Sequence, residues 1–358
     1  MATGLRCMIM RGGTSKGAYF MRDELPSDPG VRDELILRIV GSPDPRQIDG
    51  IGGAHPLTTK VAVVGPSTSE HADVEYLFLQ PAVDEPLVSD RQNCGNLLAG
   101  VAPFAIERGL VTASGHSASV RILMLNTQSM AVATVAVAEG MPNYSGDVAI
   151  SGVPGTAAPV QLDFQDLAGG TCGALLPTAH STDVIDGVEC TLVDNGMPVV
   201  VMRAADLGVT GYEDCAALEA NTKLRARLET IRLEAGERMG LGDVSAATIP
   251  KLTMVASARD GGSLCTRTFI PHRCHSAIGV LGAVSVATAA LLPGTPAASV
   301  LTDVPRGASM VLEHPTGTFE TTVDVAIDSE GVPVVKRAGI VRTARKLMDG
   351  LVFPRDPA

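Results

Sequence analysis

Short apolar runs separated by turn residues dominate the chain, and this pattern predicts many short β-strands. Glycine (38 residues) and proline (23 residues) supply the turns between these runs. The segments that we expect to form strands are Gly17–Met21, Val61–Val64, Val74–Leu79, Val120–Leu125, Met130–Ala138, Val188–Val193, Pro198–Met202, Leu252–Val255, Ala308–Leu312 and Thr321–Ala326.

Four other segments have the three- and four-residue apolar spacing of helices. Val31–Val40 and Asp214–Met239 are amphipathic, and the second is expected to lie on the surface. Asn96–Glu107 and Ser276–Leu292 are apolar on all sides and contain glycine, so we expect them to be buried. The last segment is too short and too rich in small residues to predict a membrane span.

Two pairs of features recur at nearly the same spacing. The strand Pro198–Met202 begins 181 residues after Gly17–Met21 (198 minus 17), and both follow polar, glycine-bearing turns. Cys274 lies 180 residues after Cys94 (274 minus 94), and each cysteine is expected to open one of the buried helices. This spacing predicts a tandem pseudo-repeat of two similar halves, with a boundary near residue 183.

Composition limits the classes of partner. The chain has 358 residues, a net charge of −11 and no basic cluster, which argues against a nucleic-acid partner. Any anionic substrate must therefore be bound by local positive groups. The seven cysteines form no C-x-x-C pair and no apolar signal segment opens the chain, so we expect reduced thiols and a cytoplasmic protein without a membrane partner.

The segment MRGGTSKGAYF, Met10 to Phe20, contains glycines, hydroxyl groups and a lysine, as a phosphate loop does. A phosphate loop has its lysine directly before Ser or Thr and continues into a helix, whereas Ser15 precedes Lys16 here and a strand is expected to follow. Side-chain donors and exposed backbone N–H groups predict a carboxylate-binding loop instead, with a purely structural turn as the alternative. The candidate binding residues are Arg11, Gly12, Gly13, Thr14, Ser15 and Lys16.

Cys94 lies at the expected N-terminus of a buried helix, within the sequence Asn93-Cys94-Gly95-Asn96. The unpaired N–H groups and the helix dipole favour a thiolate at such a position, and Gly95 lets a carboxylate approach the same N–H groups. The alternative is a small buried apolar side chain, which is what most free cysteines are.

Lys60 directly precedes a strand that is expected to be buried. A lysine against apolar walls can act as a base, whereas the alternative is a side chain that extends its ammonium to solvent at the strand end. The preceding glycines, Gly50, Gly52 and Gly53, do not have the spacing of a dinucleotide-binding fingerprint.

In the second half, Arg273, Cys274 and His275 are candidates for a second anion-binding or acid/base position. With His272 they also suggest a metal site, but their spacing is too close for a structural zinc pattern and no second cluster exists. The sequence therefore predicts no metal.

Several long motifs resemble the 2-methylaconitate isomerase-like family. They are MRGGTSKGAYF, GSPDPRQIDGIGG, LTTKVAVV, QNCGNLLAGVAPFAIERGLV, DNGMPVV, IPHRCHSAIGVLGAVSVAT, EHPTGTFE and VRTARKLMDG. The resemblance implies an α+β, diaminopimelate epimerase-like fold with two pseudo-repeated domains. In each domain, β-strands wrap around a buried central helix, and the active site lies in the cleft between the domains. It also implies that the C-terminal segment returns, giving a first domain of residues 1–183 with 335–358 and a second of residues 184–334.

The resemblance implies that Lys60 and Cys94 are catalytic. The surroundings of Cys274 depart from the epimerase pattern, which leaves its role open. The implied reaction is a keto–enol or allylic double-bond shift in an unsaturated oxo-tricarboxylate, 4-oxalomesaconate, in gallate and protocatechuate catabolism, without a metal or organic cofactor. The alternatives are a 2-methylaconitate or aconitate cis–trans isomerase and a non-catalytic tricarboxylate-binding accessory protein. The oligomeric state, a homodimer included, is left open.

Overall fold

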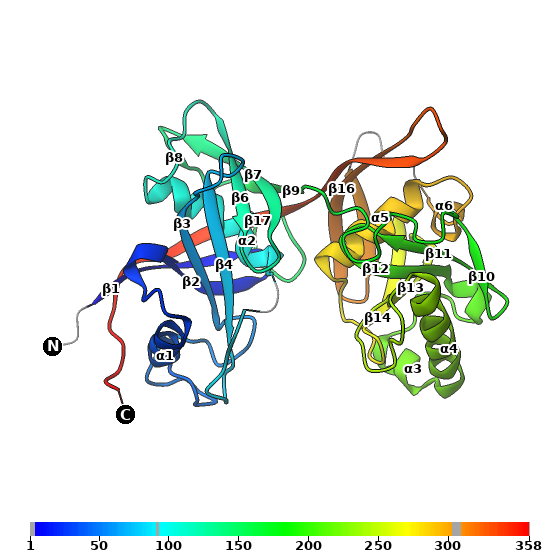
Figure 1. Cartoon of the computed structure of the whole chain (residues 1–358), viewed down its shortest axis with the longest axis horizontal. Coiled ribbons are helices and arrows are strands. Elements are labelled where there is room, and N and C mark those ends of the chain that lie inside the picture. The colour runs from blue at the N-terminus through cyan, green and yellow to red at the C-terminus, as the bar shows by residue number, and fades with distance from the viewer. Residues whose placement is uncertain (1–3, 91–92, 303–308, 358) are drawn as a thin grey trace. The chain divides into compact units, whose positions relative to one another are not determined.

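The structure is a computed structural model that describes residues 4–90, 93–302 and 309–357 (Figure 1). The chain forms two compact units: unit 1 comprises Met1–Leu162 and Val341–Ala358, and unit 2 comprises Asp163–Ile340. The sequence predicted two domains with boundaries near residues 183 and 334. That division into domains stays a prediction. None of the helices among the described residues is long and apolar enough to cross a membrane.

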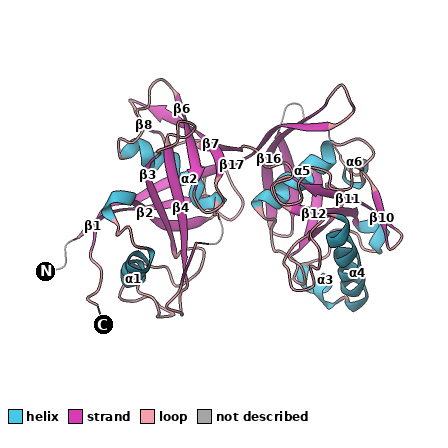
Figure 2. Ribbon diagram, in the orientation of Figure 1, coloured by secondary structure: helices cyan, strands magenta, loops and turns pink. Residues whose placement is uncertain are grey.

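Unit 1 is built on a continuous series of paired strands (Figure 2). Its main strands are β1 (Leu5–Gly12), β2 (Ser15–Met21), β3 (Lys60–Pro66), β4 (Val74–Pro81), β6 (Ser117–Met124), β7 (Ser129–Ala138) and the C-terminal part of β17 (Pro333–Val352). The order is β17-β1-β2-β3-β4-β6-β7, in which the β2–β3 and β4–β6 pairs are parallel and the others antiparallel. Shorter elements are η1 (Arg22–Glu24), β5 (Val88–Ser89), β8 (Met141–Pro142) and β9 (Pro159–Phe164), which crosses the unit boundary.

Two helices complete unit 1. Helix α2 (Gly95–Glu107) is buried along almost its whole length and contacts strands β1, β2, β3, β4, β6 and β7. Gly100 permits one of these contacts, because a Cβ there would lie 2.4 Å from the Tyr19 hydroxyl oxygen. Helix α1 (Pro29–Val40) begins where the Asp28 carboxylate accepts the Val31 N–H, and it buries its apolar side against β2, β3 and β4.

Unit 2 has the same order of pairings. Its elements are β10 (Asp183–Ile185), β11 (Val188–Asp194), β12 (Pro198–Arg203), η2 (Ala204–Leu207), α3 (Cys215–Ala220), α4 (Thr222–Arg238), β13 (Lys251–Ser257), β14 (Leu264–Phe269), α5 (Val280–Leu291), α6 (Pro296–Ser299), β15 (Ser309–His314), β16 (Gly317–Ile327) and the start of β17. From β11 to β16 the pairs are antiparallel, parallel, antiparallel, parallel and antiparallel, as they are from β1 to β7. A buried helix, α5, stands between β14 and β15, as α2 stands between β4 and β6. This shared order is what the predicted pseudo-repeat requires.

Two helix predictions need correction. Asp214–Met239 forms two helices, because Asn221 has a non-helical ψ of 89° and its side chain caps α4 by accepting the Leu224 N–H. The buried helix predicted over Ser276–Leu292 begins only at Val280. Cys274 therefore does not open it: this residue lies in an isolated bridge to Phe269, and its N–H donates to the Glu219 carboxylate. Of the predicted strand Ala308–Leu312, Ala308 lies outside the described residues.

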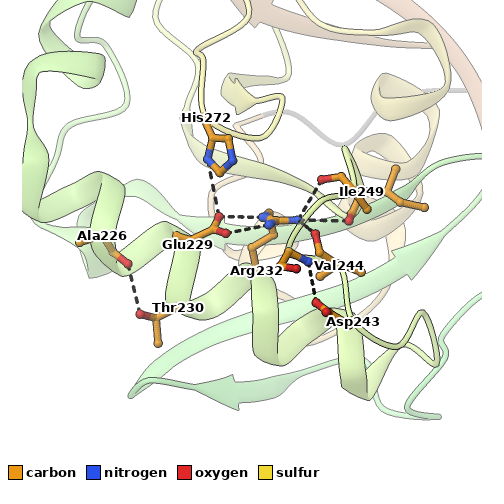
Figure 3. Close-up of polar contacts among 10 residues, drawn as sticks. Ala226, Glu229, Thr230, Arg232, Asp243, Val244, Ile249 and His272 are labelled. Carbon is orange, nitrogen blue, oxygen red and sulfur yellow. Dashed lines mark hydrogen bonds and ion pairs between the residues drawn. The ribbon is translucent and has the colours of Figure 1, made fainter.

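Arg232 on α4 is fully buried and holds unit 2 together locally (Figure 3). Its Nε and Nη2 donate to the two Glu229 oxygens, each at 2.7 Å. His272 Nδ1 lies 3.7 Å from the same carboxylate. Arg232 Nη1 donates to three carbonyl oxygens, those of Val244, Ala247 and Ile249, at 2.9, 3.2 and 3.3 Å.

Replacing this guanidinium should destabilise the fold. The Arg232→Met change leaves three carbonyl groups and Glu229 without their donor, so we expect the free energy of unfolding to fall by about 3 kcal/mol. Urea unfolding followed by circular dichroism measures the change. Arg225→Met, on an exposed turn of the same helix, is the matched control and should stay within about 0.5 kcal/mol of wild type. Equal stability of the two variants would contradict this assignment.

Candidate active site

The turn between β1 and β2 rests on the first turn of α2. A Cβ on Gly12 would lie 2.4 Å from the Asn96 carbonyl oxygen, and one on Gly13, whose φ is +51°, would lie 2.2 Å from Asn96 Oδ1. The Thr14 N–H donates to Asn96 Oδ1 at 3.4 Å, and Asn96 Nδ2 donates to the Thr14 hydroxyl at 3.1 Å. Glycine is needed at both positions, because a side chain at either one would push the turn away from the helix. As predicted, a strand and not a helix follows this turn.

Ser15 presents a buried hydroxyl group beside this contact. The residue is 2% exposed, and among the described residues its Oγ has no hydrogen-bond partner. Ser15 and Gly17 lie on the same face of β2, and a Cβ on Gly17 would approach the Leu97 side chain of α2 to 2.9 Å. The Ser15 hydroxyl therefore lies on the α2 face of the strand, free to donate to an anion.

Cys94 is the residue that precedes α2, as predicted. Its carbonyl oxygen accepts the Leu98 N–H at 2.9 Å, whereas its half-buried side chain makes no capping hydrogen bond. The N–H groups of Gly95 and Asn96 belong to the first turn, where a helix offers them no internal acceptor. The adjoining Asn93 donates from its side-chain amide to Thr127. Cys94 thus carries a thiol directly beside donors that can bind an oxyanion.

Two buried tyrosines hold this end of α2. The Tyr76 hydroxyl donates to the Cys94 carbonyl oxygen at 3.4 Å, and the Tyr19 hydroxyl donates to the Leu97 carbonyl oxygen at 2.6 Å. Burial, followed by the nearby Cys94, raises the pKa of both tyrosines well above the usual range. Both phenols therefore stay protonated and serve as fixed donors.

Lys60, the first residue of β3, lies on the face of the sheet that is directed to α2, next to side chains of strand β4. Tyr76 and Phe78 are two residues apart on β4, so their side chains point to one face. Tyr76 reaches Cys94, and the Lys60 Nζ lies 5.0 Å from the centre of the Phe78 ring. Lys60 is 8% exposed, and its amine bonds to Gln80 within the protein instead of extending to solvent. The structure therefore gathers the two predicted catalytic residues over one face of β4.

Gln80 is a functional candidate that sequence reasoning missed. Its Oε1 accepts a hydrogen bond from Lys60 Nζ at 2.6 Å. The orientation of the amide is determined, because its Nε2 faces three carbonyl oxygens, which can only accept: those of Thr59, Pro81 and Pro56, at 2.9, 3.2 and 3.3 Å. No sequence motif marks Gln80. Only its alternation with Phe78 on the strand that faces Lys60 could have indicated it.

Arg11 and Lys16, predicted to bind substrate, line a cavity of unit 1 whose lining includes neither Lys60 nor Cys94, although Lys16 also borders a small pocket beside Lys60. Lys16 lies between Ser15 and Gly17, so its side chain lies on the face of β2 that points away from α2. Their predicted contact with substrate stays a prediction.

The three candidates in unit 2 do not reproduce the arrangement around Cys94. Arg273 is exposed and lies 3.7 Å from the Glu219 carboxylate. The thiols of Cys274 and Cys215 both approach the His275 carbonyl oxygen, at 3.9 and 3.7 Å. Burial, and then the Cys215 thiol, raises the pKa of Cys274 to about 12, so its thiol is protonated at neutral pH. Burial lowers the pKa of His275, with a further contribution from Lys251.

No group of three or more His, Cys, Asp or Glu side chains is placed to hold a metal ion in the part of the chain that the structure describes.

The fold class follows from comparison with solved structures. The crystal structure of methylitaconate Δ-isomerase matches with a TM-score of 0.91 and 34% identity, covering 99% of this chain and 96% of that chain. A hydroxyproline epimerase from Agrobacterium vitis matches with a TM-score of 0.53 and 14% identity, covering 100% of this chain and 95% of that chain, and so shows the fold alone. The chain therefore has the α+β fold that methylitaconate Δ-isomerase shares with this epimerase.

The chain belongs to the PrpF family, whose model, described as "PrpF protein", matches residues 3–355. It is 58% identical over 349 residues to (4E)-oxalomesaconate Δ-isomerase of Novosphingobium sp. strain KA1, covering 97% of this chain and 96% of that protein. It is 55% identical over 351 residues to 4-oxalomesaconate tautomerase of Pseudomonas putida, covering 98% and 96%. The family resemblance predicted from the motifs is confirmed.

The difference in reactivity that we expect between Cys94 and Cys274 can be measured by chemical labelling. Iodoacetamide at about pH 7.5 should label Cys94 in the folded protein and leave Cys274 unlabelled, because only a thiolate reacts and Cys274 is buried as a thiol. Peptide mass spectrometry reads the site, and Cys94→Ser and the urea-unfolded protein are the controls. Labelling of Cys274 ahead of Cys94 would overturn the contrast.

Proposed function

We propose that the chain is an isomerase that moves a proton within 4-oxalomesaconate, an unsaturated oxo-tricarboxylate, without a cofactor. The observation that carries this proposal is that a buried lysine and the cysteine directly before helix α2 lie over one face of β4. Identities of 58% and 55% to an oxalomesaconate isomerase and an oxalomesaconate tautomerase support the substrate. The gallate and protocatechuate pathway, the two pseudo-repeated domains and the location of the substrate in a cleft stay predictions.

Proton transfer accounts for the reaction. A C–H bond next to a carbonyl and conjugated with an alkene is acidic enough for a side-chain base. Lys60, acting as a neutral amine, removes this proton, and the electron pair spreads over a dienolate. The Cys94 thiol returns a proton at the other end of the allylic system, which completes a keto–enol or double-bond shift. The reverse assignment of acid and base to these two residues remains the alternative.

The dienolate needs donors that are already in place. The N–H groups of Gly95 and Asn96 at the start of α2 and the unpartnered Ser15 hydroxyl provide them on the same face as Lys60 and Cys94. Donors fixed in a desolvated site stabilise a developing oxyanion strongly, because they need no reorganisation during the reaction. The Tyr19 and Tyr76 phenols contribute by holding the helix end in position.

A 2-methylaconitate or aconitate isomerase is the second candidate function. The 34% identity to methylitaconate Δ-isomerase supports the same proton chemistry on a smaller substrate but is well below the identity to the oxalomesaconate enzymes. Small acids of this kind differ in only a few pocket contacts, so both substrates belong in the test.

Proton NMR of the purified protein in D₂O, with 4-oxalomesaconate and 2-methylaconitate in parallel, tests the function. We expect isomerisation of the first acid, with deuterium entering at its allylic carbons. Turnover of only the second acid would assign the alternative activity. Absence of exchange with both acids would support a binding protein without catalysis.

Removing the amine of Lys60 tests the base. Lys60→Met should lower kcat by about 10²–10⁴-fold, because general base catalysis contributes that much. Lys251 is the matched control: it opens β13 as Lys60 opens β3, yet its amine donates to the Thr248 carbonyl oxygen. Lys251→Met should keep wild-type turnover. Wild-type turnover by Lys60→Met would refute the assignment.

The Cys94 role is tested by isotope exchange. Cys94→Ser should lose deuterium exchange at the carbon that the thiol protonates, while the carbon facing Lys60 continues to exchange. NMR integration of the two positions measures this. Wild-type exchange at both carbons would count against Cys94.

The Gln80 contact predicts opposite shifts of the pH profile. With Lys60 as base, kcat/KM falls as the pH falls and the amine gains its proton. Gln80→Glu places a carboxylate beside the ammonium and stabilises it, so the acid limb moves to higher pH. Gln80→Met removes the acceptor, so the limb moves to lower pH, and kcat falls about tenfold with the lost hydrogen bond. Gln165→Glu is the control at an exposed position in unit 2. It adds the same charge as Gln80→Glu and should leave the acid limb of the kcat/KM profile where it is in wild type. A purely structural Gln80 would lower activity in both variants without moving the limb.

A further inference from the structure

A cavity of about 650 Å³ lies in unit 1, and its lining includes neither Lys60 nor Cys94. One wall is formed by residues of β1, β2 and β17, and the other by the segment Tyr144–Ala157. That segment is fixed in place: the Tyr144 hydroxyl donates to Glu107 at 2.8 Å, its carbonyl accepts the Ala158 N–H at 3.0 Å, and Val148 pairs with Ala157. The volume is within the range of pockets that hold small molecules.

Three cations stand side by side on the strand wall. Lys16 on β2 is paired directly with Arg11 on β1, and Arg11 is paired directly with Arg345 on β17. All three residues line the cavity. Like charges at directly opposite positions of neighbouring strands destabilise a sheet, so the row has a cost that the fold alone does not explain.

No acidic side chain offsets this row. The described residues that line the cavity include neither Asp nor Glu, and none of the three cations forms an ion pair within the described ranges. This is unusual in a chain with 39 acidic and 28 basic residues. Asp147 belongs to the anchored segment but does not line the cavity, and Glu107, which accepts the Tyr144 hydroxyl, also bonds to Lys346.

Arg11 is the fixed member of the row. Its Nη1 donates to the Gly13 carbonyl oxygen at 3.0 Å and to the Thr343 carbonyl and hydroxyl oxygens, each at 2.9 Å. These bonds orient the guanidinium and leave its other nitrogens available. Burial lowers the pKa of Arg11, and the neighbouring Arg345 lowers it further, as expected for a cation without a counter-ion.

We propose that this cavity is an anion-binding site for a small di- or tricarboxylate, separate from the donors at the start of α2. Two guanidinium groups and one ammonium group match two or three carboxylates, and arginine binds carboxylates through paired hydrogen bonds. Hydroxyl groups of Ser145 and Thr156 on the facing wall supply further donors. The site is separate because Lys16 points to the opposite face of β2 from Ser15.

Calorimetric titration with propane-1,2,3-tricarboxylate, at ionic strength held constant with chloride, tests the proposal. Wild type should bind the probe, and Arg345→Gln should weaken the binding at this site by about tenfold, the effect of one lost charge-assisted hydrogen bond. Arg46→Gln removes the same charge from a side chain that is 79% exposed and should bind as wild type. Ser15→Ala should also retain this binding, because Ser15 belongs to the α2 face.

Thermal melting without ligand separates binding from folding. Because Arg345→Gln relieves a like-charge pair, its melting temperature should equal that of wild type or rise by about 1–2 °C. Wild-type affinity in a folded Arg345→Gln variant, or loss of all probe binding in Ser15→Ala, would overturn the proposal. Equally tight binding of inorganic phosphate would overturn the assignment to carboxylates. These measurements need no turnover, so failure of the proposed isomerase activity leaves their outcome intact.

Discussion

Burial of helix α2 is the constraint on which unit 1 depends. Strands contact the helix along most of its length, so its side chains form the centre of the unit. A helix cannot satisfy the N–H groups of its own first turn, and an apolar surrounding offers them nothing. The Gly12–Thr14 turn packs against this helix end and bonds to the Asn96 side chain, so the backbone donors of the first turn are left next to Cys94 and Ser15. The candidate site is thus the incompletely satisfied end of a structural helix, and the same strands that bury α2 carry Lys60 and Gln80 to it.

Unit 2 shows that the order of strands does not by itself create such a site. Its buried helix begins after Gly279, and Asn195 from the β11–β12 turn bonds to Ser285 and Thr288 along the side of that helix. Cys274 lies six residues before the helix begins (280 minus 274), in a bridge to Phe269, with its thiol beside Cys215. The two units therefore share an order of strand pairing but differ in where they place a cysteine relative to unpaired N–H groups.

Patterns of neighbouring residues in the sequence predicted those strands and helix starts that depend only on neighbouring residues. Runs of aliphatic residues predicted β3 and β12. The change from the polar segment Asn93–Asn96 to an apolar run predicted that Cys94 lies at the start of α2. Strand β14 was missed because its buried residues include Thr266 and Arg267, whose partners come from Glu313 and Glu213, distant in sequence. The start of α5 and the break at Asn221 were missed because apolar periodicity continues through both. No sequence pattern singles out Gln80 or Arg345, because the contacts that distinguish them, to Lys60 and Arg11, depend on the register between neighbouring strands.

The distribution of ion pairs explains why Lys60 and the cation row stand apart in an acidic protein. Elsewhere in unit 1 arginines pair with carboxylates, as Arg108 does with Asp349 and Arg121 with Asp73. A carboxylate beside Lys60 would hold the proton on its amine and prevent it from acting as a base. The amide of Gln80 accepts the same hydrogen bond without a charge, so in the proposed mechanism it orients the amine and still allows the proton to leave. Within the described ranges Arg11 and Arg345 form no ion pair with a carboxylate, which fits the proposed anion site, because a cation that receives an anion from solution cannot already be neutralised by the protein.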